Sequence, residues 1–304
     1  MLKTIKAHLL YWLGIMKRAA KIWLDSDAFA HAGSLAFFTL FSIAPVMIVI
    51  VSVVGVFYGE EAAQGQIVTQ LQETIGNEAA QAVQSAVSSS SLKGGGLFAT
   101  IAGIFAMLVG ATTVFGQMQN SLNAIWTVIP KPSRNGILLF LRKRLTSLTI
   151  VLAVGFVMLV SLSLSVGLRV LLENVQGWLP WYGVAYNALE LTLSILVASL
   201  LFATLFKVLP DVLLSWRDVA VGALLTAVLF TVGRSLIAFY LSYTATASTY
   251  GAAGSLVLLL LWVNYSSLIL LYGAAFTKAH LLARGLTVQP RNVAVRIRHE
   301  IIEE

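Results

Sequence analysis

Long apolar stretches separated by hydrophilic segments make up most of this 304-residue chain. Each stretch has about 19 to 25 residues, the length an α-helix needs to cross a hydrocarbon core of about 30 Å. Polar residues do not recur along the stretches at the 3.6-residue period of a helix that faces water on one side. The pattern predicts six transmembrane helices, at residues 35–57, 97–115, 148–166, 184–206, 219–241 and 252–276.

The composition supports a membrane protein. With 58% hydrophobic and 11% charged residues, the chain has too little polar surface to cover a soluble globule of this size. Backbone groups in hydrocarbon must satisfy one another, which leaves helix bundles and closed β-barrels. Continuous apolar runs favour helices, because barrel strands alternate over short segments. We therefore expect an all-α, polytopic membrane protein with a single domain over residues 1–304.

Basic residues lie on alternate sides of the expected spans. Most of the 20 Lys and Arg residues precede the first span, follow the sixth, or lie between spans two and three or four and five. Because basic residues that flank spans are retained in the cytoplasm, both termini are predicted to be cytoplasmic. The net charge of +7 then reflects topology and attraction to anionic lipid head groups at the cytoplasmic face. Nucleic acid is not an expected partner.

The hydrophilic segments carry helical patterns of their own. In residues 1–33, apolar residues recur at three- and four-residue steps opposite four lysines, which is typical of an amphipathic helix at the cytoplasmic membrane surface. A helix that docks onto a partner is the alternative. Residues 59–96 are expected to form an acidic outer loop. Its apolar residues share a helical face, which predicts one or two surface helices over the outer mouth of the bundle; they are Ile67, Leu71 and Ile75, with the spacing repeated by Val83 and Val87. Residues 277–304 form a cytoplasmic tail.

Polar side chains inside apolar spans are costly and therefore mark candidate functional positions. Arg234 lies about 15 residues into the fifth span, or about 22 Å from the cytoplasmic surface. It either extends to the outer interface or binds an anionic group in a cavity. Glu190, in the fourth span, lies at a similar depth and could pair with Arg234. Asn264, near the middle of the sixth span, either forms an interhelical hydrogen bond or lines a path.

Two further features concern helix shape and the cytoplasmic side. Pro45, in the middle of the first span, removes a helical hydrogen bond and predicts a kink. Gln117, Asn120 and Asn123 follow the second span at helical spacing. They form either a solvated helix end or a polar cluster at a cytoplasmic gate.

The sequence offers little for catalysis or metal binding. It contains no cysteine, so disulfides and thiolate chemistry are excluded. Asp25, Asp27 and His31 have a weak metal-like spacing with no second cluster to support it. There is no nucleophile elbow, phosphate-cradling loop or Walker sequence. We therefore expect neither enzymatic activity, nor a metal or cofactor, nor ATP hydrolysis by this chain.

Several segments, taken together, resemble the YihY/BrkB family of bacterial inner-membrane proteins. They are A-G-S-L-A-F-F-T-L-F-S-I-A-P at 32–45, N-S-L-N-A-I-W at 120–126, L-P-D at 209–211, Y-G-A-A-G-S-L at 250–256, L-L-W-V at 260–263 and G-A-A-F-T at 273–277. The resemblance covers nearly the whole chain. It implies six spans, cytoplasmic termini and an inner-membrane location. Members were once labelled ribonuclease BN, but the sequence lacks the acidic metal cluster that phosphodiester cleavage needs.

The resemblance also sets the functional hypotheses. Members are described as transporters or envelope-integrity factors, so we expect a transporter or translocator of lipid or another envelope component. The alternative is a non-transporting scaffold, either self-associating or bound to envelope proteins. Relatives often carry a Glu where this chain has Ala275 and a Gln where it has Leu268. The absence of that Glu weakens the case for a proton-coupled mechanism. A basic residue at or near Arg234 is common in the family.

Overall fold

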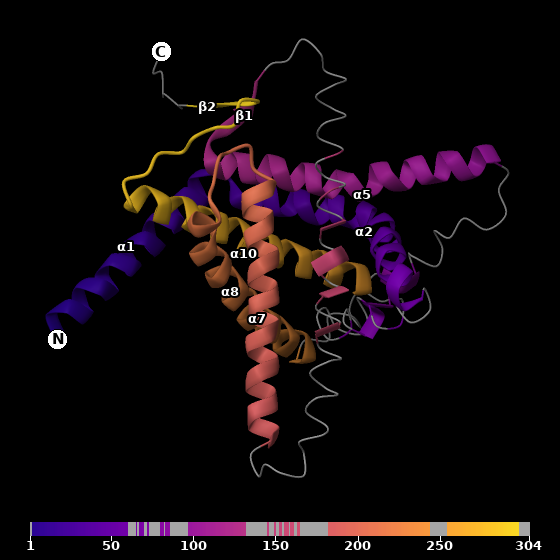
Figure 1. Cartoon of the computed structure of the whole chain (residues 1–304), viewed down its shortest axis with the longest axis horizontal. Helices are drawn as coiled ribbons and strands as arrows, with labels where there is room; N and C mark the ends of the chain where they lie inside the picture. Colours follow the sequence, from indigo (N-terminus) through magenta and orange to yellow (C-terminus); the bar gives the residue numbers. More distant parts are fainter. Residues whose placement is uncertain are drawn as a thin grey trace.

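A computed structural model of the chain describes residues 2–59, 97–131, 182–243 and 254–297, with isolated positions between 65 and 85 and between 145 and 164. Within these residues, long helices dominate (Figure 1). The elements are α1 (Leu2–Asp25), α2 (Ala28–Tyr58), α5 (Leu97–Trp126), β1 (Val128–Pro130), α7 (Tyr182–Val208), α8 (Trp216–Tyr243), α10 (Gly254–Ala283) and β2 (Ala294–Arg296).

The helices agree with the spans that the described residues can test. Segments of α2, α7, α8 and α10 are each long and apolar enough to cross a membrane. They correspond to the first, fourth, fifth and sixth predicted spans. The second predicted span lies within α5, whereas the third, at 148–166, lies mostly outside the described residues. The mostly helical architecture with several helices of membrane-spanning length is confirmed, and the number of six spans stays a prediction.

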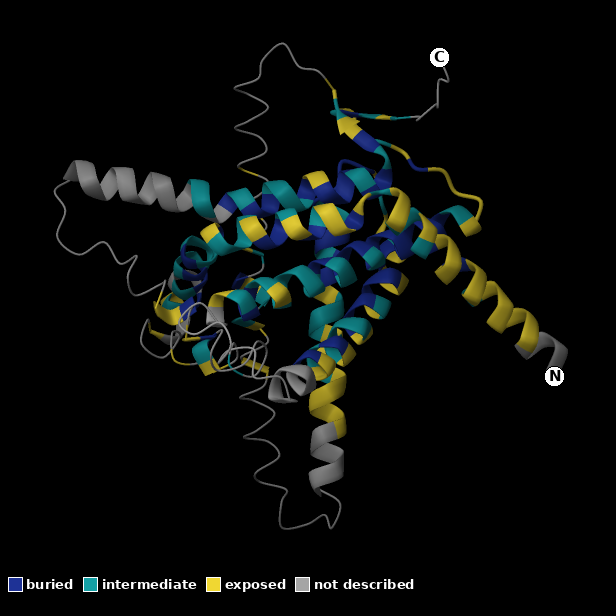
Figure 2. Ribbon diagram, turned by 180° about the vertical axis from the view of Figure 1, so that it is seen from behind, coloured by how far each residue is buried: buried dark blue, intermediate teal, exposed yellow. Residues whose placement is uncertain are grey.

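Helix α10 lies at the centre of the bundle, in contact with α1, α2, α5 and α8, while α7 packs against α8. Buried side chains from α5, α7, α8 and α10 form the main core, including Leu122, Phe206, Ala223 and Leu271. The outer faces of α2 and α7 instead expose large apolar side chains (Figure 2). Exposed apolar faces of this extent suit a bundle surrounded by lipid.

Small residues allow α8 and α10 to approach closely. Gly222 of α8 faces Thr277 of α10, and Gly273 of α10 faces Thr226 of α8. A Cβ on either glycine would overlap the threonine hydroxyl opposite it. Each hydroxyl is turned back onto its own helix, where it donates to the carbonyl of the glycine four residues earlier. This reciprocal contact is the close small-residue packing that membrane helices use.

Helix α1 confirms the expected helix in residues 1–33, and the structure shows where part of its apolar face lies. Ile15 and Ala19 are buried against α10. Trp23 Nε1 donates to the Leu268 carbonyl at 3.2 Å. The N-terminal half of α1 projects away from the bundle with apolar residues exposed (Figure 2). Its position at a membrane surface stays a prediction.

Most of the predicted outer loop, residues 59–96, lies outside the described residues. Among its described positions, Ile67, Ala80 and Val83 are helical and almost completely buried. They pack in one cluster with side chains of α2 and with Leu259 of α10. The predicted apolar spacing therefore faces the bundle at these positions, while the loop's position over an outer mouth stays a prediction.

Residues 286–297, which we call the C-terminal strap, belong to the folded core. Strand β2 pairs antiparallel with β1, and Pro290 forms an isolated bridge with Val212. Beneath the strap, Trp126 is fully buried in a cluster with Val212 and Val288. The segment predicted as a tail, 277–304, is therefore partly folded. Its first residues continue α10 to Ala283, and the strap packs onto the bundle.

Candidate functional site

Arg234 lies on α8, partly buried, next to a close contact between α8 and α10. A Cβ on the preceding residue, Gly233, would lie 2.7 Å from the Tyr265 hydroxyl oxygen. Asn264 lies one residue from Tyr265, and its Nδ2 is 4.0 Å from the Cβ position of Gly33 in α2. Arg234 and Asn264 therefore lie at the same level of α10, but Asn264 faces α2 rather than α8.

Glu190 is exposed on α7 and does not pair with Arg234. The register of α7 and α8 follows from Phe202 and Phe230, whose ring centroids lie 5.7 Å apart. Arg234 is one turn beyond Phe230, whereas Glu190 is three turns beyond Phe202, so the two lie about 12 Å apart along the helices. Within the described part of the chain, the ion pair is between Asp218 and Arg284.

The three polar residues predicted as a candidate cluster on α5 differ in their exposure. Asn120 is exposed, Gln117 is partly buried, and Asn123 is buried. The Gln117 carbonyl accepts a hydrogen bond from the Ser121 hydroxyl at 3.0 Å. Asn123 instead belongs to a network with residues outside the predicted set.

That network surrounds the carboxylate of Asp211, in the segment between α7 and α8. Asn123 Nδ2 donates to Asp211 Oδ2 at 2.8 Å, and the Asp211 amide donates to Asn123 Oδ1 at 2.8 Å. Gln119 Nε2 donates to the other carboxylate oxygen at 3.3 Å. Asp211 is buried, with 7% of its surface exposed. Site prediction missed Asp211 and Gln119, although two of the segments that carry the family resemblance meet here.

Basic side chains bind the C-terminal ends of two helices at this end of the bundle. The Arg291 guanidinium donates to the carbonyls of Lys207 and Val208 at 3.0 and 3.3 Å, at the end of α7. Lys278 is buried, and its Nζ donates to the Ile125 carbonyl at 2.7 Å, at the end of α5. Cations are favoured at helix C-termini, where carbonyls lack helical partners. These residues therefore hold the bundle together in addition to contributing to the topology signal.

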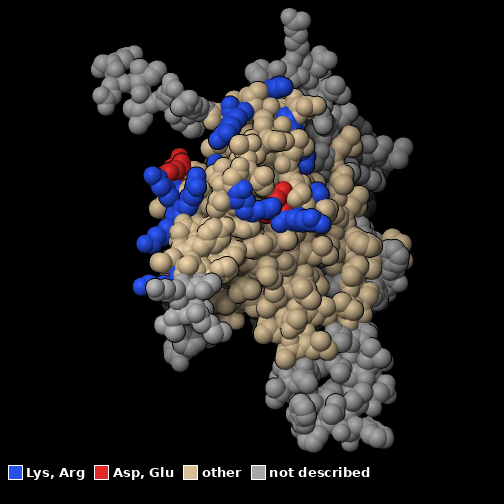
Figure 3. Space-filling model, turned by 60° about the vertical axis from the view of Figure 1, so that its left-hand side comes forward, with Lys and Arg blue, Asp and Glu red and all other residues tan. Residues whose placement is uncertain are grey.

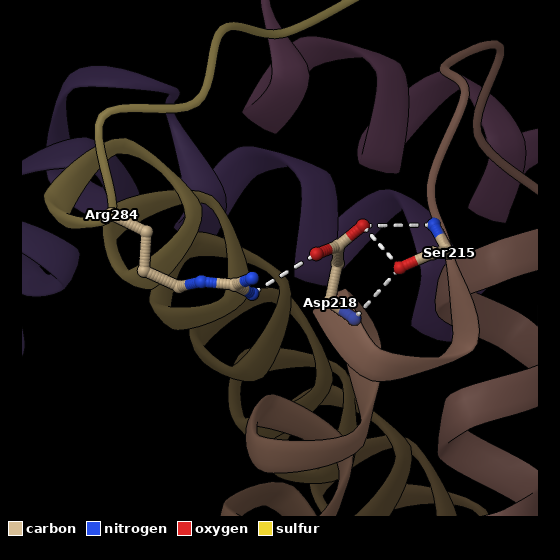
Figure 4. A network of polar contacts seen from close by, with 3 residues as sticks. All are labelled: Ser215, Asp218 and Arg284. Carbon is tan, nitrogen blue, oxygen red and sulfur yellow. Dashed lines mark hydrogen bonds and ion pairs between the residues drawn. The ribbon is translucent and has the colours of Figure 1, made fainter.

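Helix α8 begins with a reciprocal capping contact between Ser215 and Asp218 (Figure 4). The Asp218 amide donates to the Ser215 hydroxyl at 3.3 Å, and the Ser215 amide donates to Asp218 Oδ2 at 2.9 Å. Arg284, at the end of α10, contacts the other carboxylate oxygen at 3.1 Å. The S-x-x-D spacing before an apolar run is a sequence signal that would have predicted this helix start.

The remaining predicted positions have structural contacts. His31 Nδ1 lies 3.2 Å from the Ser121 hydroxyl, which joins the start of α2 to α5. No group of three His, Asp or Glu side chains that could hold a metal gathers among the residues the structure describes. Pro45 lies within α2, which continues on both sides of it, and faces Gly110 of α5. The kink at Pro45 stays a prediction.

Basic side chains gather at one end of the molecule, beside a wide uncharged surface (Figure 3). Apolar helices around a central α10, with basic side chains gathered at one end, define a polytopic α-helical membrane protein. The chain belongs to the BrkB family, because the family model described as "Virulence factor BrkB" matches residues 19–296. The family resemblance noted in the sequence is thereby confirmed.

Curated relatives of the chain include UPF0761 membrane proteins. One from Stenotrophomonas maltophilia is 27% identical over 88% of this chain and 61% of its own length. One from Vibrio campbellii is 30% identical over 82% of this chain and 76% of its own length, and one from Mannheimia succiniciproducens is 23% identical over 81% and 82%. The chain thus spans about three fifths of the Stenotrophomonas relative. No solved structure matches the chain.

Proposed function

We propose that this protein is a bacterial inner-membrane translocator of an anionic lipid or related envelope component, without ATP hydrolysis of its own. The proposal includes six spans, cytoplasmic termini and an α1 whose projecting half lies on the cytoplasmic leaflet. The observation that carries it is the partly buried Arg234 within the apolar helix α8. A guanidinium at such a position is costly unless an anion or water reaches it.

Asn264 supports the same path. It lies at the level of Arg234 along α10, on the side of α2. Lipid head groups that pass between helices need polar contacts within the apolar region. Arg234 on α8 would supply one, and Asn264 on α10 would supply another. Glu190 forms no ion pair with Arg234, so the guanidinium charge is not neutralised by that carboxylate.

The test is lipid translocation in proteoliposomes, with head-group-labelled phosphatidylglycerol and a membrane-impermeant quencher. We expect the wild-type protein to move label between leaflets and Arg234→Gln to reduce the rate at equal protein content. Ser235→Ala, at the exposed neighbouring position, is the control and should leave the rate unchanged. A wild-type rate equal to that of empty liposomes would rule out unaided translocation of this lipid.

A scaffold is the second candidate, and the projecting half of α1 favours it. Leu9, Leu10 and Leu13 are 44–60% exposed there, which leaves an apolar surface for an envelope partner or a second copy. Removal of the C-terminal residues tests this candidate only if it begins after Ile297, because the strap before it is part of the fold. A scaffold that uses α1 should lose captured partners when Leu9 and Leu13 are changed to Ser, while a translocator keeps its flux.

A further inference from the structure

The end of α7, the start of α8 and the segment between them present a basic and aromatic surface, which we call the α7–α8 corner. It consists of Lys207, Leu213, Trp216 and Arg217. We propose that this corner binds the head group of an anionic phospholipid in the leaflet beside it. The inference rests on the proposed membrane orientation of this end, but it does not depend on transport.

The corner is held in a fixed shape by the residues around it. The reciprocal contact between Ser215 and Asp218 fixes the first turn of α8, and therefore the positions of Trp216 and Arg217. The Leu213 amide donates to the Gln289 carbonyl of the C-terminal strap at 2.8 Å. Arg291 binds the Lys207 carbonyl from the same strap. A surface that is formed in advance loses less entropy when a ligand binds.

The side chains of the corner match a phospholipid at the edge of a bilayer. Trp216 is 51% exposed and Leu213 is 59% exposed, so both offer apolar surface to acyl chains or glycerol. Lys207 Nζ lies 4.4 Å from the centroid of the Trp216 ring, and Arg217 is exposed on the next residue. Indole rings favour the membrane interface, and ammonium and guanidinium groups bind phosphate.

The local charge balance favours an anion. Asp218 is the acidic residue of the first α8 turn, and Arg284 together with the Ser215 donors already binds its carboxylate. Lys207 is placed against an aromatic ring rather than a carboxylate, and the ion pair among the described residues is the one that Arg284 makes. The positive charge of Lys207 and Arg217 is therefore available to a phosphodiester.

The first experiment is lipid binding to the delipidated full-length protein in detergent, measured by native mass spectrometry with phosphatidylglycerol or phosphatidylcholine. We expect a preference for phosphatidylglycerol that weakens as salt rises. The double variant Lys207→Gln, Arg217→Gln should bind phosphatidylglycerol about thirtyfold more weakly than the wild type. Each basic residue contributes about 1 kcal/mol to binding, and a loss of about 1.4 kcal/mol weakens binding tenfold. Lys131→Gln, an exposed lysine at the same end, is the matched control.

A second measurement places the lipid at Trp216. Brominated phosphatidylglycerol should quench a fraction of the tryptophan fluorescence that is missing in Trp216→Phe, and brominated phosphatidylcholine should quench that fraction less. Equal binding by the double variant and the wild type would overturn the proposal, as would displacement of the lipid by millimolar inorganic phosphate. Arg234→Gln should retain the lipid, so a failure of translocation and a failure of this site give different results.

Discussion

Asp211 has a buried carboxylate that, among the described residues, is stabilised by amides rather than by a cation. Amide donors lower the cost of burying this charge, because each replaces a lost hydrogen bond to water. The donors come from α5, so the carboxylate ties α5 to the segment between α7 and α8. The network is therefore a buried polar connection between segments that are far apart in the sequence.

We therefore expect Asp211→Ala to destabilise the protein more than a typical surface change does. The substitution leaves the amides of Asn123 and Gln119 buried without their acceptor, and should cost about 2–4 kcal/mol. The measurement is unfolding of the purified protein in mixed detergent micelles. Asp25→Ala removes an exposed carboxylate at the end of α1 and should change stability by less than about 0.5 kcal/mol. Equal stability of the two variants would contradict the structural role of Asp211.

The sequence could suggest these residues one at a time, but not their contacts. Asn123 was a candidate because it is polar near the end of an apolar helix. Its partner Asp211 is 88 positions away in the chain, and no local period connects the two. Likewise, the depth of Arg234 and Glu190 follows from counting along spans, whereas their separation depends on the register of α7 against α8. Long-range packing determines which predicted residues meet.

The close packing of α8 against α10 depends on the contacts of Gly222 with Thr277 and of Gly273 with Thr226. Gly222→Ala places a methyl group into the Thr277 hydroxyl, and such overpacking costs about 1–3 kcal/mol. Gly116→Ala is the control, since a Cβ there meets nothing within 4 Å. An alanine at that helical position should be neutral or stabilise by about 0.5–1 kcal/mol.

A double variant tests whether the loss comes from the contact itself. Gly222→Ala with Thr277→Ala removes the hydroxyl that the new methyl group would strike, so part of the lost stability should return. Thermal unfolding of the single and double variants gives the coupling directly. If the losses of the two single variants simply add, the close approach of α8 and α10 does not determine stability.

The C-terminal strap should also contribute to stability. Removing residues 286–304 takes away β2 and uncovers the cluster around Trp126. Because the truncation exposes the buried Trp126 side chain, it should lower the free energy of unfolding by roughly 3 kcal/mol or more. Removing only residues 298–304 keeps the strap and should leave the unfolding temperature unchanged. Identical unfolding of both truncated proteins would mean that the strap adds no stability.

The apolar pattern predicted the helical architecture of the molecule, because that architecture depends on the length and hydropathy of the apolar stretches alone. Helices α7 and α8 begin and end within three residues of the predicted spans, whereas α2 begins seven residues before its span and α10 ends seven residues after its own. The pattern could not predict that α1 packs along α10, because an amphipathic face suits lipid and protein equally. Nor could it predict the strap, because its strand β2 and the partner strand β1 have only three residues each.

The ends of α5, α7 and α10 and the start of α8 meet at one end of the bundle, through the contacts of Lys278, Arg291 and Arg284. If this basic end is cytoplasmic, the opposite ends of the spans face outward. The chain has no native cysteine, so single cysteines can report the orientation without background. Thr287 and Gly65 are exposed, one in the strap and one in the predicted outer loop.

In spheroplasts, a membrane-impermeant maleimide should label Gly65→Cys at once and Thr287→Cys only after the membrane is permeabilised. A Cβ at Gly65 meets nothing within 4 Å, so this substitution should not disturb the fold. The reverse labelling would place the basic end outside and remove the basis for a cytoplasmic lipid contact at the α7–α8 corner. Labelling of both sites in intact spheroplasts would show that residues 65 and 287 lie on the same side, which contradicts the predicted arrangement of spans between them.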